Sequence, residues 1–436
     1  MDAKFGQRRR AVMFGIFCLA AAVVALLFVS YQTVTLFYSL LTVYIFFVFL
    51  TIWLDGAWRT ISPPKPAKWP GVSIIIPSYN SASTLRDCVA ACKRLRYAGK
   101  AEIIVIDDGS TDGSCESLRI AGVKVFRKEN GGKASAMNFG IKKASYGRIV
   151  CVDSDSYPRE DALEKMVPYM EEDSKVGAVV LFICVSRPKS LLAKVQEIEY
   201  WVSYGFFLKA LDSIGGLYVT PGPMALYRRE VFEKLGGFEE KNITEDMEIA
   251  LRMQKNGWKI RACHQSVVYT EAPDTLQGVF RQRFRWFRGG FANVIKYFDM
   301  FFNEKFGAFG FFVLPLILVA GFFASTFMLW ILASWAKSAL SLVLPSLGNM
   351  KTLGDFIVSA PGSLDYMAVD SVFIFSIFCT LIWCFFVYKS FQITGNRFGP
   401  KHAVPMALLL FAFPLFLGFT FLASYAAEFT GLKRGW

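Results

Sequence analysis

Histidine is nearly absent from this sequence, and cysteine occurs without the spacing that metal sites use. The 436 residues include two histidines, His264 and His402, and nine cysteines, none of which forms a Cys-x-x-Cys pair or a cluster with histidine. We therefore expect no structural zinc site. The same scarcity leaves no Ser/His or Cys/His arrangement for nucleophilic catalysis. The cysteines are interpreted as buried or free thiols in a reducing compartment.

Acidic residues are also in deficit. The chain has 48 lysines and arginines against 35 aspartates and glutamates, a formal net charge of +13. This charge suits contact with anionic lipid headgroups or phosphorylated substrates. Nucleic acid is the rival partner, but a 54% hydrophobic composition is more apolar than that of DNA-binding or other ordinary globular proteins. We expect a membrane protein that contacts lipids and has no nucleic-acid partner.

Long apolar runs predict membrane helices at both ends of the chain. Residues 1–60 are predicted to form a transmembrane hairpin from the runs 11–29 and 34–54, each near the ~20 residues that a spanning helix needs. The arginine-rich start places the N-terminus in the cytoplasm, and residues 61–70 form a proline-rich linker. The runs 308–335, 367–388 and 403–427 predict a C-terminal transmembrane region over residues 308–436.

Residues 71–276 have the pattern of a soluble α/β domain. The runs 72–77, 102–107, 147–153 and 177–183 are rich in Val and Ile and alternate with helix-like stretches such as 83–96. Such continuous apolar strands predict a mostly parallel sheet. Ligands of these sheets bind at the carboxyl ends of the strands, which is where this sequence carries acidic residues and glycines.

Three motifs follow the predicted strands. Tyr79 lies in Pro-Ser-Tyr-Asn, Asp108 lies in Asp-Asp-Gly-Ser, and Asp153-Ser-Asp155 ends the third clear strand. Taken singly, each is most simply a polar turn. The two carboxylates of Asp153 and Asp155 would point to opposite faces of an extended segment, so the chain must turn for both to act together. Hard divalent cations take such oxygen ligands.

Two further motifs open helical stretches. In Asn130-Gly-Gly-Lys133, the glycines are consistent with a simple turn into a helix, or with close approach of the backbone to a phosphate beside the Lys133 cation. In Thr244-Glu-Asp246, the simplest interpretation is a threonine N-cap followed by acids that favour the first helical turn.

The stretch 277–290, QGVFRQRFRWFRGG, lies between the soluble domain and the membrane region. Its four arginines and four aromatic residues are typical of an interfacial helix, with Arg at the phosphates and the rings at headgroup depth. We predict that residues 277–307 form this interfacial segment.

In this order and within one α/β domain, these motifs resemble those of membrane-integrated, processive family 2 glycosyltransferases, whose Gln-x-x-Arg-Trp signature matches Gln282, Arg285 and Trp286. The pattern is most similar to poly-N-acetylglucosamine synthases, with cellulose, chitin and hyaluronan synthases next. The resemblance implies a cytosolic GT-A (nucleotide-diphospho-sugar transferase) domain inserted between two membrane helices before it and about three after it, in the plasma membrane.

The resemblance also implies roles on the donor side. Tyr79 would line the base, and Asp108 would accept a hydrogen bond from the uracil N3–H. Lys133 and Asn138 would contact the donor. Asp153 would hold the ribose or a metal-bound water, and Asp155 would bind Mg²⁺ or Mn²⁺, which neutralises the diphosphate leaving group.

On the acceptor side, the resemblance makes Asp246 the general base, with Glu245 as the neighbouring acid that tunes it. Gln282 would lie near the acceptor end, Arg285 at the diphosphate, and Trp286 under the acceptor sugar. The remaining arginines of the stretch, Arg281, Arg283 and Arg288, would then meet lipid phosphates.

The implied reaction is inverting transfer of a sugar from a UDP-sugar, with UDP-N-acetylglucosamine the best guess, to a growing β-linked polysaccharide that passes through the membrane helices. The alternative is transfer of one sugar to a membrane lipid such as a ceramide or polyprenol. A hypothesis from another class is a transporter or scaffold that only binds nucleotide, but the sequence lacks the intramembrane charge pairs and broken-helix symmetry expected of such a protein. An accessory subunit or a second copy of the chain is compatible with the resemblance.

Overall fold

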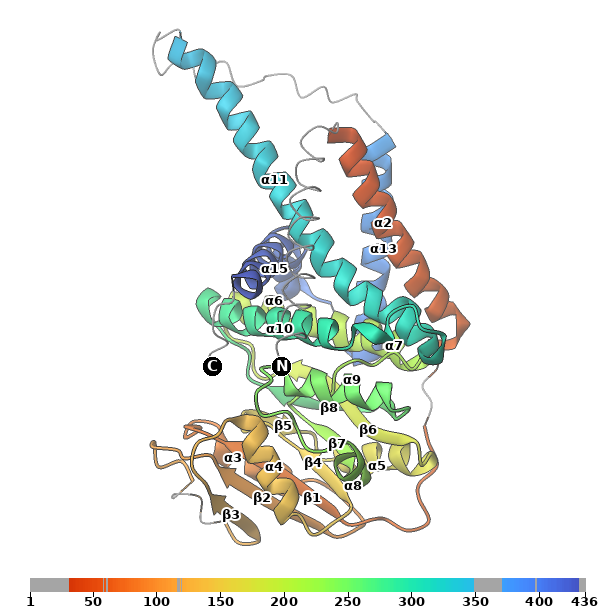
Figure 1. The fold of residues 1–436 in the computed structure, drawn as a ribbon, viewed down its shortest axis with the longest axis vertical. Coiled ribbons are helices and arrows are strands. Elements are labelled where there is room, and N and C mark those ends of the chain that lie inside the picture. The colour runs from red at the N-terminus through yellow and green to blue at the C-terminus, as the bar shows by residue number, and fades with distance from the viewer. Residues whose placement is uncertain are drawn as a thin grey trace, which may run out of the picture.

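The structure is a computed structural model. It describes residues 31–348, 371–396 and 398–430, apart from residues 58, 60, 61, 116, 117 and 119. A sheet domain forms one end of the molecule, a layer of horizontal helices lies against it, and long apolar helices rise on the other side of that layer (Figure 1). The first predicted membrane run, 11–29, lies outside the described residues.

The sheet domain is built on one eight-stranded sheet with the order β3-β2-β1-β4-β7-β6-β8-β5. Strands β1 and β6 are buried along their whole length, as expected for strands covered on both faces. The strands are β1 (Val72–Ser78), β2 (Ala101–Asp107), β3 (Val123–Arg127), β4 (Arg148–Cys151), β5 (Ser156–Pro158), β6 (Val176–Val185), β7 (Ala225–Arg228) and β8 (Lys259–Thr270).

The sheet is mixed, which departs from the mostly parallel sheet predicted. Strands β1 to β4 run parallel, but β7 lies antiparallel between β4 and β6, and β5 is antiparallel to β8. Strands β5 and β7 have only three and four residues, which is too few for an apolar run to indicate a strand. Because β1, β2 and β4 keep one direction, their carboxyl ends still meet at one edge.

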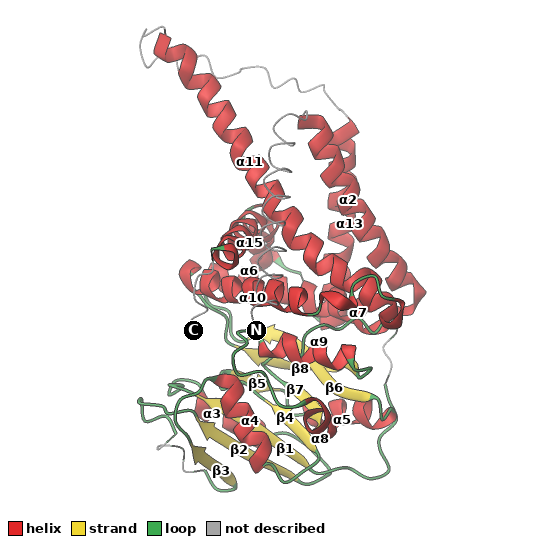
Figure 2. Cartoon of the chain, viewed as in Figure 1, coloured by secondary structure: helices red, strands yellow, loops and turns green. Residues whose placement is uncertain are grey.

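Helices cover both faces of the sheet (Figure 2). Side chains of alternate strand residues pack into two separate clusters, one toward α4 and α9 and the other toward α3 and α5. The helices of the sheet domain are α3 (Leu85–Lys93), α4 (Lys133–Lys143), α5 (Ala162–Glu172), α8 (Arg229–Leu235) and α9 (Glu245–Lys255).

The intermediate layer consists of α10 (Leu276–Lys296) and the segment formed by α6 (Leu191–Tyr200), a π-helical stretch (Trp201–Phe207) and α7 (Leu208–Ser213) (Figure 1). Thr275 caps α10, its hydroxyl accepting a hydrogen bond from the Gly278 N–H at 3.1 Å. Phenylalanines of α10 pack on α15, where the rings of Phe287 and Phe421 stack with centroids 3.5 Å apart. The layer thus joins the sheet domain to the apolar helices.

The apolar helices are α2 (Tyr31–Ile52), α11 (Leu314–Gly348), α13 (Ser371–Thr394), α14 (Ala403–Phe411) and α15 (Phe413–Phe429). Within the described part of the chain, two helical stretches are long and apolar enough to cross a membrane, Leu36–Gly56 and Phe309–Trp330. The stretches Pro400–Phe411 and Phe413–Glu428 meet that test together, with a bend of 41° between them. Helix α13 lies beside α2 (Figure 1).

Candidate active site

The ends of β1 and β2 place Tyr79 and Asp108 side by side. Ser78 and Asp107 are register partners in the parallel pair, and the Asp108 N–H donates to the Ser78 carbonyl at 2.9 Å. Tyr79 is 53% exposed, so its ring is open to a ligand, whereas Asp108 is 2% exposed.

The Asp108 carboxylate is held by three donors. Lys128 Nζ lies 2.6 Å from its Oδ1, and the backbone N–H groups of Gly131 and Gly132 donate to it at 3.1 and 2.7 Å. Gly132 opens α4 with φ at +86°, a conformation that favours glycine. The Gly131 N–H also lies 3.3 Å from Oδ2. These four contacts orient Asp108 and occupy the about four lone-pair sites of a carboxylate, so a donor group on a ligand would replace or share one of them.

Lys133 lies between carboxylates from two other elements. Its Nζ is 2.5 Å from Asp153 Oδ1 and 3.5 Å from Glu245 Oε1. Lys133 begins α4, Asp153 follows β4, and Glu245 begins α9. Gly222 allows this packing, because a Cβ there would lie 2.5 Å from Lys133 Nζ and 3.1 Å from Asp153 Cγ. The structure therefore brings residues 133, 153 and 245 together from distant parts of the chain.

The electrostatics of this group favour a charged Lys133 beside two acids, Glu245 and Asp246, that hold their protons more tightly than usual. Burial opposes the charge of Lys133, but Asp153, Glu245 and Asp246 outweigh burial and raise the pKa of the lysine. Burial raises the pKa of Glu245 and of Asp246, against the opposing effect of Lys133. One Glu245 oxygen, Oε2, is buried without a hydrogen-bond partner among the described residues. Such a perturbed, partly unsatisfied group is typical of a functional site.

Asp155 lies beside this group at the start of β5. Its Oδ1 accepts from the Ser156 hydroxyl at 3.1 Å and the Thr270 hydroxyl at 3.4 Å. Burial, and then the negative charge of Asp153, raises the pKa of Asp155 to about 6. Among the described residues, no three His, Cys, Asp or Glu side chains come together as a metal cage. Asp153 and Asp155 fit the other kind of divalent-cation site, in which one or two carboxylates act with substrate phosphates.

The Gln-x-x-Arg-Trp residues lie on α10, and Arg285 is close enough to Asp246 to act on its charge. Arg285 donates to the Ile243 carbonyl at 3.1 Å, and its charge lowers the pKa of Asp246 against the effect of burial. The Arg283 guanidinium lies 4.2 Å from the centroid of the Trp286 ring. The side-chain oxygen of Gln282 is buried without a partner among the described residues.

Comparison with known proteins identifies the domain. Residues 73–236 match the model of the glycosyl transferase family 2. The chain carries a family 2 glycosyltransferase domain. This confirms the family predicted from the motifs, and the mixed sheet with flanking apolar helices is the GT-A-like arrangement expected for it.

Curated relatives of this glycosyltransferase are bacterial polymer synthases. The poly-beta-1,6-N-acetyl-D-glucosamine synthase of Staphylococcus aureus (strain COL) is 32% identical over 225 residues, which make up 50% of this chain and 54% of that protein. The synthase of Staphylococcus epidermidis is 30% identical over 230 residues, with the same coverage. The chain spans about half the length of the curated relatives it matches.

A solved structure supports the fold of the glycosyltransferase. The mannosyltransferase from Pyrobaculum calidifontis, in complex with GDP-Man and Mn²⁺, superposes with a TM-score of 0.54 and covers 86% of this chain and 98% of its own. Its sequence identity is 21%, so the likeness concerns the fold alone.

Two arginines of the glycosyltransferase do not face lipid as predicted. Arg283 is 4% exposed and forms an ion pair with Glu199 of α6 at 2.6 Å. Arg288 is 5% exposed and pairs with Glu428 of α15 at 2.6 Å. Both charges are buried between helices, because α10 is enclosed by protein on these sides rather than by headgroups. Arg281 is exposed, as a lipid-facing residue would be.

One other prediction needs correction. Thr244 stands at the N-cap of α9 but its side chain does not cap the helix; instead, its hydroxyl accepts from Asn293 Nδ2 at 3.0 Å. The Asn138 amide accepts from the Phe238 N–H at 2.8 Å and donates to the Phe238 carbonyl and to Glu240. These bonds use both ends of the amide and hold the loop after α8, and the contact of Asn138 with the donor stays a prediction.

The sequence patterns missed several residues that shape this site. Gly222, Glu199 and Asn293 belong to no recognised motif, and each acts on a residue far away in the sequence. A glycine between two prolines, at 221–223, was the one available signal for the close approach at Gly222.

Proposed function

We propose that this protein transfers a sugar, with inversion, from a UDP-sugar to a growing β-linked polysaccharide and passes the polymer through its membrane helices. UDP-N-acetylglucosamine is the proposed donor, because the curated relatives are poly-beta-1,6-N-acetyl-D-glucosamine synthases. The observation that carries the proposal is the group of carboxylates around Lys133, which brings together Asp153 at the end of β4 and Glu245 at the start of α9. The sheet domain would face the cytoplasm of a cell whose plasma membrane holds the apolar helices.

Asp246 is the proposed base. It would remove the proton from the acceptor hydroxyl as that oxygen bonds to the anomeric carbon, while the bond from that carbon to the diphosphate oxygen breaks on the opposite face. A single displacement converts an α-linked donor into a β-linked product. The raised pKa of Asp246 suits a proton acceptor that works near neutral pH. Glu245, buried and partly unsatisfied, would keep Lys133 in place beside the donor.

The diphosphate side is assigned to cationic groups. Lys133 and Arg285 would face the leaving group from two directions. A Mg²⁺ or Mn²⁺ ion held by Asp155, with Asp153 beside it, would supply further neutralisation of the diphosphate. Tyr79 and Asp108 would hold the base.

The acceptor side is assigned to α10. Trp286 would stack on the acceptor sugar with the ring face that Arg283 leaves open. The unpartnered Gln282 oxygen would accept a hydrogen bond from a sugar hydroxyl near the acceptor end. The apolar helices beyond α10 would then receive the product.

The test uses purified full-length protein in lipid vesicles with labelled UDP-N-acetylglucosamine and Mg²⁺ or Mn²⁺. UDP release and product size are measured together, and Asp246→Asn is the inactive control. Release of UDP with a long product supports the proposal. A product that carries one sugar on a lipid supports the alternative, and the absence of UDP release with a panel of UDP-sugars refutes both. Full activity in a folded Asp246→Asn variant refutes the assigned base.

A further inference from the structure

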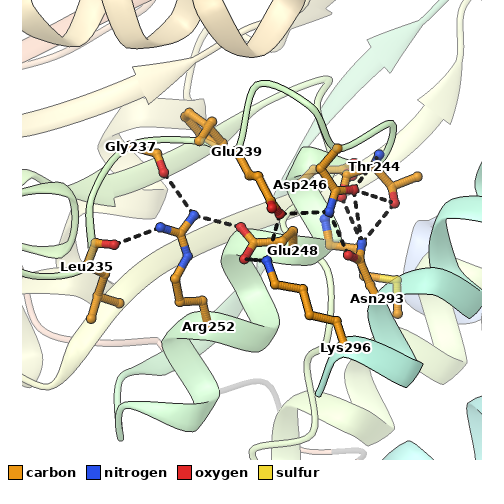
Figure 3. Close-up of polar contacts among 12 residues, drawn as sticks. Leu235, Gly237, Glu239, Thr244, Asp246, Glu248, Arg252, Asn293 and Lys296 are labelled. Atoms are coloured by element: carbon orange, nitrogen blue, oxygen red, sulfur yellow. Dashed lines mark hydrogen bonds and ion pairs between the residues drawn. The ribbon is translucent and has the colours of Figure 1, made fainter. Parts of the chain in front are cut away.

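The C-terminal half of α10 is fastened to the start of α9 by a buried amide. Asn293 is 1% exposed, and its Nδ2 donates to the Thr244 carbonyl at 3.2 Å and to the Thr244 hydroxyl at 3.0 Å (Figure 3). The Asn242 amide donates to Asn293 Oδ1 at 2.7 Å. A buried amide that is satisfied in this way specifies one arrangement of the two segments, since any other leaves polar groups unpaired.

A second contact holds α9 one turn further along. Glu248 is 1% exposed, and its carboxylate accepts from Lys296 at 2.8 Å, from the Tyr297 hydroxyl at 2.6 Å and from Arg252 at 2.6 Å (Figure 3). Lys296 also contacts Glu239 at 2.7 Å. Residues 244 and 248 of α9 are thus both tied to residues 293–297, the end of α10.

Asp246 lies between these two attachment points. Its own backbone carbonyl accepts from the Thr220 hydroxyl at 2.9 Å, and its Oδ1 accepts from the Met247 N–H at 2.8 Å. The same helix α10 carries Arg285 and Trp286, eight and seven residues before Asn293. The joint between the two helices therefore fixes where the Asp246 carboxylate lies relative to Trp286.

We propose that Asn293 is a positioning residue for Asp246. By holding Thr244 on α10, it sets the separation between the carboxylate that removes the proton and the surface that carries the acceptor sugar. This inference rests on the proposed function, because it assumes that Asp246 and Trp286 act on one acceptor. Tyr79 and Asp108, which would hold the base of the donor, follow β1 and β2 and lie outside this joint.

The variants Asn293→Ala and Asn293→Asp test the inference. The aspartate keeps the size of the side chain and can still accept from Asn242, but it cannot donate to Thr244. Both variants should lower kcat at least about tenfold, since a misplacement of 1 Å can cost about a hundredfold. The KM for the donor should change much less than kcat, because the base-binding residues lie outside the joint. Asn256→Ala, the same change at the exposed far end of α9, is the matched control and should behave as the wild type.

Hydrogen–deuterium exchange gives a readout that does not need activity. Exchange at residues 244–250 should become faster in Asn293→Ala, while exchange in α3 should not change. Unchanged exchange at 244–250, or a wild-type kcat in either Asn293 variant, overturns the inference. A kcat and a donor affinity that fall together with general unfolding also overturn it, because Asn293 is then merely structural. A wild-type protein that binds no UDP-sugar refutes the proposed function instead, and exchange at 244–250 still decides whether Asn293 orders the start of α9.

Discussion

Replacement of Gly289 by alanine should separate α10 from the start of α9, whereas the same change at Gly290 should not. A Cβ on Gly289 would lie 2.5 Å from Thr244 Cγ2 and 2.9 Å from Thr244 Cβ. Thr244 cannot rotate away without losing the hydrogen bond between its hydroxyl and Asn293. A Cβ on Gly290 would have Met247 Sδ as its nearest neighbour, at an ordinary contact distance of 3.7 Å.

The two substitutions differ only in this contact. Alanine in a helix interior is more favourable than glycine by about 1 kcal/mol, and this gain applies to both positions. Overpacking at Gly289 costs about 1–3 kcal/mol, and a lost Thr244–Asn293 hydrogen bond adds about 1 kcal/mol. We therefore expect Gly289→Ala to lower the free energy of unfolding by about 1–3 kcal/mol and Gly290→Ala to raise it by up to about 1 kcal/mol.

Thermal unfolding and sugar transfer measured on both variants check this expectation. A domain of this size loses about 2–4 °C of Tm per kcal/mol, so the two variants should differ by several degrees. Gly289→Ala should also transfer sugar more slowly at unchanged donor affinity. Equal stability and equal activity of the two variants would refute the reasoning, because they would mean that α10 and Thr244 are not in the tight contact described here.

Three further predictions follow from the charged groups. Burial raises the pKa of Asp246, and a base must be deprotonated to act. As the pH is lowered, kcat should therefore begin to fall at a higher pH than it would with a carboxylate of ordinary pKa. A pH–rate profile in which kcat falls only near the ordinary pKa of an aspartate contradicts this. Asp155→Ala should weaken Mn²⁺ binding, measured by calorimetry in the presence of UDP, and unchanged affinity excludes Asp155 as a ligand. Arg283→Met should lower the free energy of unfolding by about 3–5 kcal/mol, because it leaves the Glu199 carboxylate buried without its partner. Adding Glu199→Gln should recover part of this loss in chemical denaturation, and no recovery rules out the ion pair as the cause.

The edge of the sheet that carries Tyr79, Asp108 and Asp153 could be predicted from the sequence. Each residue follows a Val- or Ile-rich run, and the carboxyl ends of parallel strands meet at one edge. The short antiparallel strand β7 could not be predicted, because four residues between a Pro/Gly loop and a helix have no distinctive period. Its position between β4 and β6 is set by tertiary pairing.

The contacts of α10 were the least predictable part of the candidate site. Arginines beside aromatic residues at a membrane boundary indicate contact with lipid, and that expectation was wrong for Arg283 and Arg288. Their partners, Glu199 and Glu428, lie 84 and 140 residues away in the sequence. No local pattern distinguishes an arginine that faces headgroups from one that is buried against a distant glutamate.

The spacing of these contacts explains how α10 can hold its side chains in one orientation. Three of its polar attachments are Arg283 to α6, Arg288 to α15 and Asn293 to the start of α9. They follow one another at intervals of five residues, and five residues turn an α-helix through about 140° beyond a full circle. The three attachments therefore leave the helix in three well-separated directions. A rotation of α10 about its axis, or a shift toward any one neighbour, must break at least one of them. The orientation of α10, and with it the position of Trp286, is thus fixed by the apolar helices, the intermediate layer and the sheet domain together.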